Sequence, residues 1–482
     1  MTKLSSPPNG NAAQDYFTVV AERVAAAGRV RIEQSDILLA IWDGVTPGAI
    51  GGTRHTIASA VKLGTPVLWI NAANPQHMAL LRTPEELFAL TALPPVTRAE
   101  IEALFESMLN PPTSDQNERA IRFHTEQWHR RSKRRFHAYR RIEALFGGTG
   151  WRGRFGRLVQ TYEAPQDIAR GSAAGTLATA YDLPGGETAF VRKIETDIFE
   201  RFAWADGLST YLSDAYRGGM VMNFLLSAMA IIVGVAYLPL ASVDAKWPFA
   251  LTEFILLTTI LVITTIGQRK NWHSRWFETR RVAEYFRHAP NMLLLGVARS
   301  SGRWPRGADT EWPEYYAREV LRDIGLPSIK IGQAYLQQAL QNLLHTHATR
   351  QRLYHEQKAY RLTRVHHKLD HLSERLFILA VLSVSTFLML IALGAAGMIP
   401  ASIAHDTSKT FTFLGVILPA LGGAFAGIRY FGDFERFASI SEVTAEKLGE
   451  VEHRIAILLN LPTGELRYAQ IADLAHAMDD IV

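Results

Sequence analysis

The sequence predicts a membrane protein, mainly α-helical, with a partial α/β domain at its N-terminus and two transmembrane helical hairpins (four spans) that carry long cytoplasmic helices. Four apolar stretches have about the 20 residues that a helix needs to cross a bilayer core of about 30 Å. They occupy residues 219–241, 249–267, 376–399 and 411–428. Two apolar runs on either side of a glycine-rich turn near the N-terminus predict the α/β part.

Short connectors join the stretches in pairs. Residues 242–248 and 400–410 are too few to hold a domain, so each pair should cross the membrane and return. Each connector carries one Lys and one Asp, whereas the opposite ends of the stretches carry Arg217, Arg269, Lys270, Arg275, Lys368, Arg375, Arg429 and Arg436. By the positive-inside rule, the N-terminus, the middle segment and the C-terminus are expected in the cytoplasm.

Few polar features interrupt the stretches. Glu253 is the only formal charge within them, and we interpret it as an interfacial residue rather than a proton site. Gly423 and Gly427 form a GxxxG step, which lets another helix approach closely. This step is expected either to pack within the chain or to form a surface for self-association.

The composition narrows the chemistry. The chain of 482 residues has no Cys, which excludes disulfides and thiol chemistry, and its net charge is +5. Residues 118–143 contain nine Arg or Lys and three Glu, and they predict a basic helix. Because no recognised nucleic-acid fold surrounds it, anionic lipid headgroups or acidic neighbours are favoured over nucleic acid as its partner. His367 and His371 have the i, i+4 spacing of zinc ligands but lack an accompanying carboxylate, so neither a metal site nor a cofactor is predicted.

The N-terminal part predicts a β-α-β unit. Residues 15–27 form an amphipathic helix, 36–42 and 66–71 two parallel strands, and 53–63 the helix between the strands. The turn after the first strand supplies the candidate ligand-binding residues Asp43, Gly44, Gly51, Gly52 and Thr53, because a helix N-terminus presents free N–H groups to an anion. The alternative is a tight structural turn with Thr53 as the N-cap.

The runs SDILLAIWDG and GAIGGTRHTIASAVKLGTPVLWI resemble the second half of the SLOG superfamily of Rossmann-like domains, over residues 14–72. The enzymatic branch of that superfamily carries PGGxGTxxE, and Thr56 stands where its glutamate belongs. The resemblance therefore implies nucleotide binding without hydrolase activity, and no enzyme is expected. The resemblance begins at about the first helix of the family pattern, without the opening strand and glycine-bearing loop that supply half of the nucleotide pocket. It therefore implies an incomplete pocket with three explanations: the start omits a piece, the domain has become structural, or a partner completes the pocket.

The first hairpin resembles a second family. The flanking segments IETDIFERFAWADGLSTYLSDAYR and WHSRWFETRRVAEYFRH resemble SLATT-type two-pass domains, over residues 190–290. That resemblance implies pore formation or membrane disruption in bacterial immune responses, and hence a bacterial inner (plasma) membrane. The predicted organisation is a SLOG-like part (1–112), a basic helix with an irregular connector (113–193), the first hairpin (194–290), a cytoplasmic helical region (291–375), and the second hairpin with C-terminal cytoplasmic helices (376–482).

These features predict a membrane effector. In this hypothesis the SLOG-like module senses a nucleotide-derived signal or a partner and gates permeabilisation or ion flow, in antiviral defence and as a homo-oligomer. Two alternatives stay open. One is a membrane-anchored nucleotide-processing enzyme that uses Asp43 and His55, and the other is a constitutive channel or scaffold whose N-terminal domain is only structural.

Overall fold

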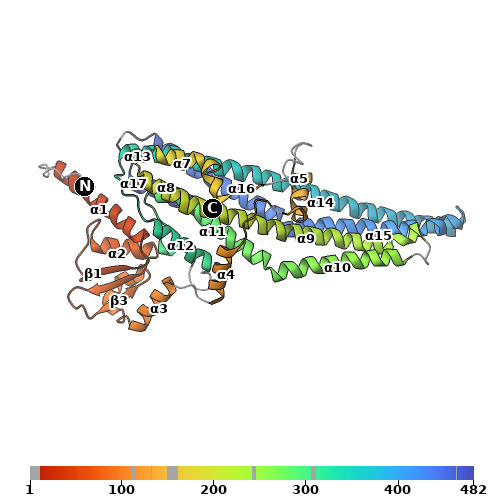
Figure 1. The fold of residues 1–482 in the computed structure, drawn as a ribbon, viewed down its shortest axis with the longest axis horizontal. Helices are drawn as coiled ribbons and strands as arrows, with labels where there is room; N and C mark the ends of the chain where they lie inside the picture. Colours follow the sequence, from red (N-terminus) through yellow and green to blue (C-terminus); the bar gives the residue numbers. More distant parts are fainter. Residues whose placement is uncertain are drawn as a thin grey trace.

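The structure is a computed structural model that describes residues 11–109, 114–131, 133–148, 161–241, 246–305, 311–462 and 464–481. It is mostly helical, and four of its helices are long and apolar enough to cross a membrane. A small α/β module lies at one end of an elongated helical bundle, and the C-terminal ends of the first and third membrane-length helices lie at the other end (Figure 1).

The α/β module contains the predicted β-α-β unit. Its elements are α1 (Asn11–Glu33), β1 (Leu38–Trp42), α2 (Thr53–Lys62), β2 (Val67–Asn71) and β3 (Met78–Leu81). β1 and β2 are parallel, as predicted, with Ala40 opposite Trp69. β3 pairs antiparallel to β2 and was not predicted. The chain reverses between them through a turn in which the Asn71 side chain accepts a hydrogen bond from the Ala73 N–H, at 2.9 Å.

Short helices connect the module to the bundle. They are the 3₁₀ turns η1 (Glu85–Phe88) and η2 (Leu90–Ala92), then α3 (Arg98–Leu109), α4 (Ser114–Thr125), the 3₁₀ turn η3 (Arg134–Phe136) and α5 (Ala138–Gly147).

The prediction of one basic helix over 118–143 is wrong, because α4 ends at Thr125 and α5 begins only at Ala138. The backbone between them pairs with a distant segment: Tyr162 N–H donates to the Arg130 carbonyl at 2.9 Å, and Arg131 forms a β-bridge with Thr161. The predicted irregular connector contains the 3₁₀ turn η4 (Pro165–Arg170) and α7 (Ala174–Tyr181); residues 149–160 of it lie outside the described residues.

The first hairpin is continuous with the bundle through one long helix. α8 (Thr188–Lys193), the π-turn η5 (Ile194–Phe199) and α9 (Glu200–Leu240) form one continuous helix of 53 residues. α10 (Trp247–Arg269) returns along α9. Asn271, in a left-handed conformation, then separates α10 from α11 (Trp272–Leu294).

The second hairpin has the same design. After the 3₁₀ turn η7 (Ser301–Arg303) and α12 (Trp312–Ile324), the elements α13 (Gln333–Gln338), the π-turn η9 (Ala339–His345) and α14 (Thr346–Ala395) form a continuous helix of 63 residues. α15 (Ala401–Gly432) returns and leads into α16 (Phe434–Leu459) and α17 (Tyr468–Ile481).

One connector differs from the prediction. Residues 401–410 are not a loop, because α15 begins at Ala401, directly after Pro400 in the N-cap position. Proline suits the edge of a helix, where its missing N–H has no partner to lose. The connection between the spans is therefore only residues 396–400. Pro419 lies inside α15 without ending it.

The membrane-length helices expose much of their apolar surface. None of the 23 residues of α10 is buried, and large apolar side chains such as Phe254 and Leu261 are exposed on it. Val381, Leu388 and Met389 are likewise exposed on α14. A band of this extent is costly in water and suits a lipid surrounding.

The main hydrophobic core lies in the bundle beyond these exposed spans. It joins buried residues from α4 to α17, among them Ile198, Phe286, Trp312 and Leu340. The α/β module has a separate core around Ile57 and Trp69. The N-terminal part of α9 and the N-terminal part of α14 thus belong to one packed unit.

Candidate functional site

The predicted glycine turn follows β1 and ends at the N-terminus of α2. Asp43 shapes its first half, because one carboxylate oxygen accepts hydrogen bonds from the N–H groups of Val45 (3.0 Å) and Thr46 (2.9 Å). The other oxygen accepts from the Thr46 hydroxyl. These hydrogen bonds hold the pKa of Asp43 below its usual value. The carboxylate therefore stays ionised and engaged with its own loop.

The two glycines with positive φ are required by the fold. Gly44 (φ 82°) lies against the Trp69 ring, and a Cβ there would come within 3.3 Å of it. Gly51 (φ 84°) lies against α1, where a Cβ would approach the Ala21 carbonyl oxygen to 2.9 Å. The turn thus touches both the sheet and α1.

The start of α2 differs from the alternative interpretation, because Gly52, not Thr53, is the N-cap residue. Gly52 has an extended conformation (φ −76°, ψ 172°), and no side chain caps the helix. Thr53 is exposed, as are Val45 and Ile50 of the turn. Among the described residues, no side chain caps the first N–H groups of α2, and helix ends of this kind can bind anions.

The end of α1 connects the α/β module to the bundle. The buried carboxylate of Glu33 pairs with Arg29 and with His476 of α17, both at 2.8 Å, and accepts the Ala298 N–H at 3.3 Å. Burial opposes the charge on Glu33, but the partners outweigh it, so the pKa of Glu33 is lowered. Arg29 also reaches Asp473 at 2.7 Å. Sequence reasoning missed this junction, since Ala298 and His476 are more than 260 residues away from Glu33.

Asp36 makes a second junction just after α1. Its carboxylate pairs with Arg318 and Arg322 of α12. Nearby, the Gly302 N–H donates to the Leu63 carbonyl at 3.0 Å, which fixes the end of α2 to the segment before α12. The module is therefore attached to the bundle by charged groups and backbone together.

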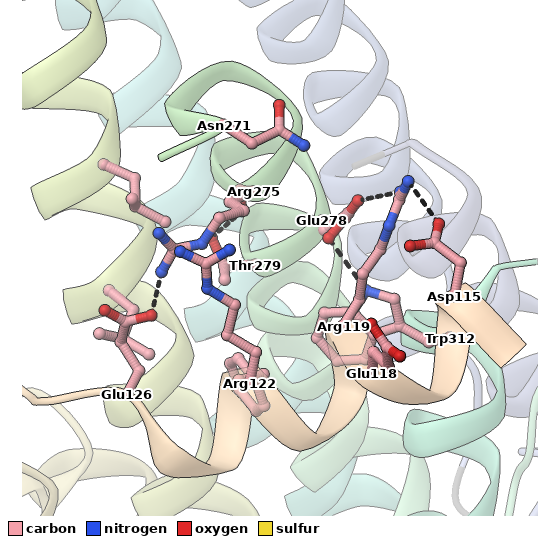
Figure 2. A pocket seen from close by; sticks show the side chains of 13 residues that line it. Asp115, Glu118, Arg119, Arg122, Glu126, Asn271, Arg275, Glu278, Thr279 and Trp312 are labelled. Atoms are coloured by element: carbon pink, nitrogen blue, oxygen red, sulfur yellow. Dashed lines mark hydrogen bonds and ion pairs between the residues drawn. The ribbon is translucent and has the colours of Figure 1, made fainter. Parts of the chain in front are cut away.

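A cavity of about 220 Å³ lies between α4, α9, α11 and α12. Figure 2 shows Arg119 between Asp115 and Glu278, with a nitrogen 2.8 Å from each carboxylate. Glu278 also accepts a hydrogen bond from the Trp312 indole at 3.0 Å. This group of side chains ties α4 to α11 and α12.

At the other side of the cavity, Arg275 pairs with Glu126, and the Arg122 guanidinium lies next to them (Figure 2). Burial lowers the pKa of Arg275. The lining as a whole has three arginines and four carboxylates, and the pairing uses most of both. Such a balanced cavity has little net attraction for a charged ligand, and the side chains that line it link α4 to α11 and α12.

The histidines of α14 contact different partners. His366 approaches Glu435 at 3.6 Å, and His371 approaches Glu374 at 3.7 Å. In the described part of the chain, no three His, Asp or Glu side chains gather as a metal site would require.

The GxxxG glycines have different surroundings. A Cβ on Gly427 would overlap the Phe224 ring of α9, whereas nothing lies within 4 Å of the Cβ position of Gly423. Gly427 thus packs within the chain, and the Gly423 side of α15 is open.

Comparison with known proteins gives one match. A family model described as a protein of unknown function (DUF4231) matches residues 217–292, which span most of the first hairpin and nearly all of α11. No curated protein and no solved structure matches the chain.

Proposed function

We propose that this protein is a membrane effector in bacterial defence. In this proposal the α/β module is a SLOG-like sensor of a nucleotide-derived signal or a partner, and it controls permeation through the two hairpins of a homo-oligomer. The four membrane-length helices cross the bacterial inner membrane, and both termini lie in the cytoplasm, in line with the placement of the basic residues.

The continuity of two helices carries the proposal. The helices Thr188–Leu240 and Gln333–Ala395 each run from the main core of the bundle to the far end of an apolar stretch. A close-packed core transmits displacement rather than absorbing it. A shift of these helices within the bundle would therefore change how the apolar stretches pack.

Contacts at the α/β module support a route for the signal. The glycine turn touches α1 at Gly51, and α1 ends in the buried Glu33 that pairs with α17. An anion at the α2 N-terminus would bind next to the contact of Gly51 with α1. Differential binding to two packings of the module would then shift the hairpins between closed and open states.

Liposome release is the direct test. The purified full chain is reconstituted into dye-loaded and ion-loaded liposomes, and nucleoside mono-, di- and triphosphates and cyclic nucleotides are added in turn. We expect release with at least one nucleotide class. The proposal fails if no nucleotide causes release and chemical crosslinking into oligomers causes none either. Release of free base from nucleoside monophosphates would support the enzymatic alternative instead.

A single position tests the glycine turn. Asp and Asn both suit the N-cap of α2, so Gly52→Asp and Gly52→Asn should retain the helix. Only Gly52→Asp places a negative charge where the anion would lie, and we expect it to raise the effective nucleotide concentration for release about tenfold or more.

Gly52→Asn is the matched control and should stay near the unmodified protein. Equal responses of the two variants would contradict ligand binding at this turn. Release without any nucleotide that is the same in both variants and in the unmodified protein would support a constitutive channel.

A further inference from the structure

A second, larger cavity lies where the first hairpin leaves the bundle. Its volume is about 700 Å³. Its walls are α9, the end of α10, the start of α11, and the basic residues from 122 to 141 that connect α4 to α5. No function discussed above uses it.

Cations dominate one part of this cavity. Its lining contains seven Arg or Lys side chains and a single carboxylate, Glu126; the cations are Arg122, Lys133, Arg134, Arg135, Arg141, Lys270 and Arg275. Within the described residues, only Arg275 of these seven forms an ion pair with a carboxylate, that of Glu126. In contrast to the balanced cavity of Figure 2, this one has a strong positive excess that attracts anions.

Part of the remaining lining is apolar and belongs to the membrane-length helices. Gly219 and Met222 contribute from α9, and Ile263 and Ile266 from α10. Gly219 opens the first apolar stretch, and Ile266 lies next to the end of the second. Ile266 is 42% exposed, so the apolar part continues onto the outer surface of α10. The cations therefore begin at the level where the apolar surface of the hairpin ends.

The basic wall is held firmly against α9. At Gly218 the missing side chain admits the Phe136 carbonyl, which a Cβ would overlap. The Phe136 ring packs edge-on against Trp272 of α11, with centroids 5.5 Å apart, and against Tyr211 of α9, 5.8 Å apart. Phe136 thus fixes this part of the basic wall to α9 and α11.

We propose that this cavity binds one anionic phospholipid of the cytoplasmic leaflet, with the phosphate among the unpaired cations and an acyl chain along α9 and α10. The inference rests on the membrane placement of the hairpins in the proposed function. A free phosphate or a polynucleotide would satisfy the cations but leave the apolar part uncovered. A lipid satisfies both, and basic pockets at the cytoplasmic ends of spanning helices suit anionic headgroups.

Lipid binding to the full chain in detergent tests the proposal. Native mass spectrometry measures bound phosphatidylglycerol, phosphatidylcholine and glycerol phosphate over a range of concentrations. We expect one saturable phosphatidylglycerol per chain, with phosphatidylcholine bound at least about tenfold more weakly because it lacks net negative charge.

A charge-matched pair of variants locates the site. The triple variant Arg134→Gln, Arg141→Gln, Lys270→Gln removes three cations of the lining, and we expect it to weaken phosphatidylglycerol binding at least about tenfold. The control variant Arg31→Gln, Lys62→Gln, Lys330→Gln removes three exposed cations elsewhere and should bind as the unmodified chain does. A third variant, Ile263→Trp, fills the apolar part without changing charge, and it should also weaken binding. It provides a test of the site if the triple variant does not fold.

Three outcomes would overturn the proposal. They are equal phosphatidylglycerol binding in the triple and control variants, phosphatidylcholine binding as tight as phosphatidylglycerol binding, and glycerol phosphate binding as tight as that of the lipid. The last outcome would identify a soluble phosphate ligand. The lipid-binding measurement needs no liposome release, so the two proposals are tested separately. If the effector function fails, lipid binding is still expected, and if the lipid site fails, nucleotide-dependent release is still expected.

Discussion

At the scale of single residues, buried polar side chains join helices that are far apart in the sequence. His288 of α11 lies with a ring nitrogen 3.1 Å from a ring nitrogen of His347 of α14. Burial lowers the pKa of His288 to about 4 and holds the pKa of His347 well below its usual value. Both rings are therefore neutral near pH 7, and one donates a hydrogen bond to the other.

This pair predicts a loss of stability in mild acid. In the unfolded chain both histidines bind protons below about pH 6.5, whereas the folded pair resists protonation until much lower pH. The unfolded state then binds more protons, so the free energy of unfolding should fall by up to about 1.4 kcal/mol per pH unit for each histidine. Thermal unfolding of the full chain in detergent between pH 7 and pH 5 measures this fall.

Two variants assign the effect to the pair. His288→Leu with His347→Leu should reduce the dependence on pH, and the remainder comes from other histidines such as His355, whose pKa burial lowers to about 4. His371→Gln, whose side chain is 65% exposed, should leave the dependence unchanged. An equally steep fall in the double variant would show that other groups cause it.

At the scale of helices, glycines set how closely the spans approach one another. Gly427 of α15 packs against Phe224 of α9, and Gly422 packs against the Phe377 ring of α14, where a Cβ would come within 3.1 Å. Gly234 of α9 faces Glu253 of α10, whose carboxylate would lie 2.8 Å from a Cβ. Small residues at such points let helix backbones meet inside a membrane.

The two GxxxG positions should therefore respond differently to the same substitution. Gly427→Val forces a side chain into the Phe224 ring and should lower the free energy of unfolding by about 1–3 kcal/mol. Gly423→Val meets open space, so we expect little change in stability and, if this surface mediates self-association, a smaller oligomer. Thermal unfolding and the mass of the detergent-solubilised particle measure the two effects, and equal destabilisation by both variants would contradict the packing described here.

At the scale of the whole molecule, the α/β module lies at one end and residues 396–400, between α14 and α15, lie at the other (Figure 1). Two continuous helices and the pair α15–α16 join these ends. A membrane around the exposed apolar band would consequently separate the α/β module and the bundle from residues 396–400.

The absence of cysteine in the chain makes this orientation easy to test. Met398→Cys places a single thiol in the short connection, where the side chain is 73% exposed, and Phe88→Cys places one on the α/β module, where it is 81% exposed. A membrane-impermeant maleimide added to intact spheroplasts should label the first variant and not the second. Lysis should make both reactive, and labelling of Phe88→Cys before lysis would contradict the cytoplasmic placement.

Much of the candidate site could be read locally. Asp43 and the glycines follow a strand and precede a helix, and that order alone predicts the turn. The role of Gly51 against α1 and the capping by Gly52 could not be predicted, because they depend on how α1 packs and where α2 begins. The junction at Glu33 could not be predicted either, because it also depends on tertiary packing. Nothing near Glu33 in the chain indicates His476 as its partner.

The sequence by itself determined the four membrane-length helices, because apolar length and helical periodicity act between near neighbours. Only the tertiary structure decided where the basic segment breaks, how Glu33 joins the module to the bundle, and that seven cations surround one cavity at the end of the first hairpin. Those features arise from contacts between residues tens to hundreds of positions apart, and such contacts leave no periodic trace in the chain.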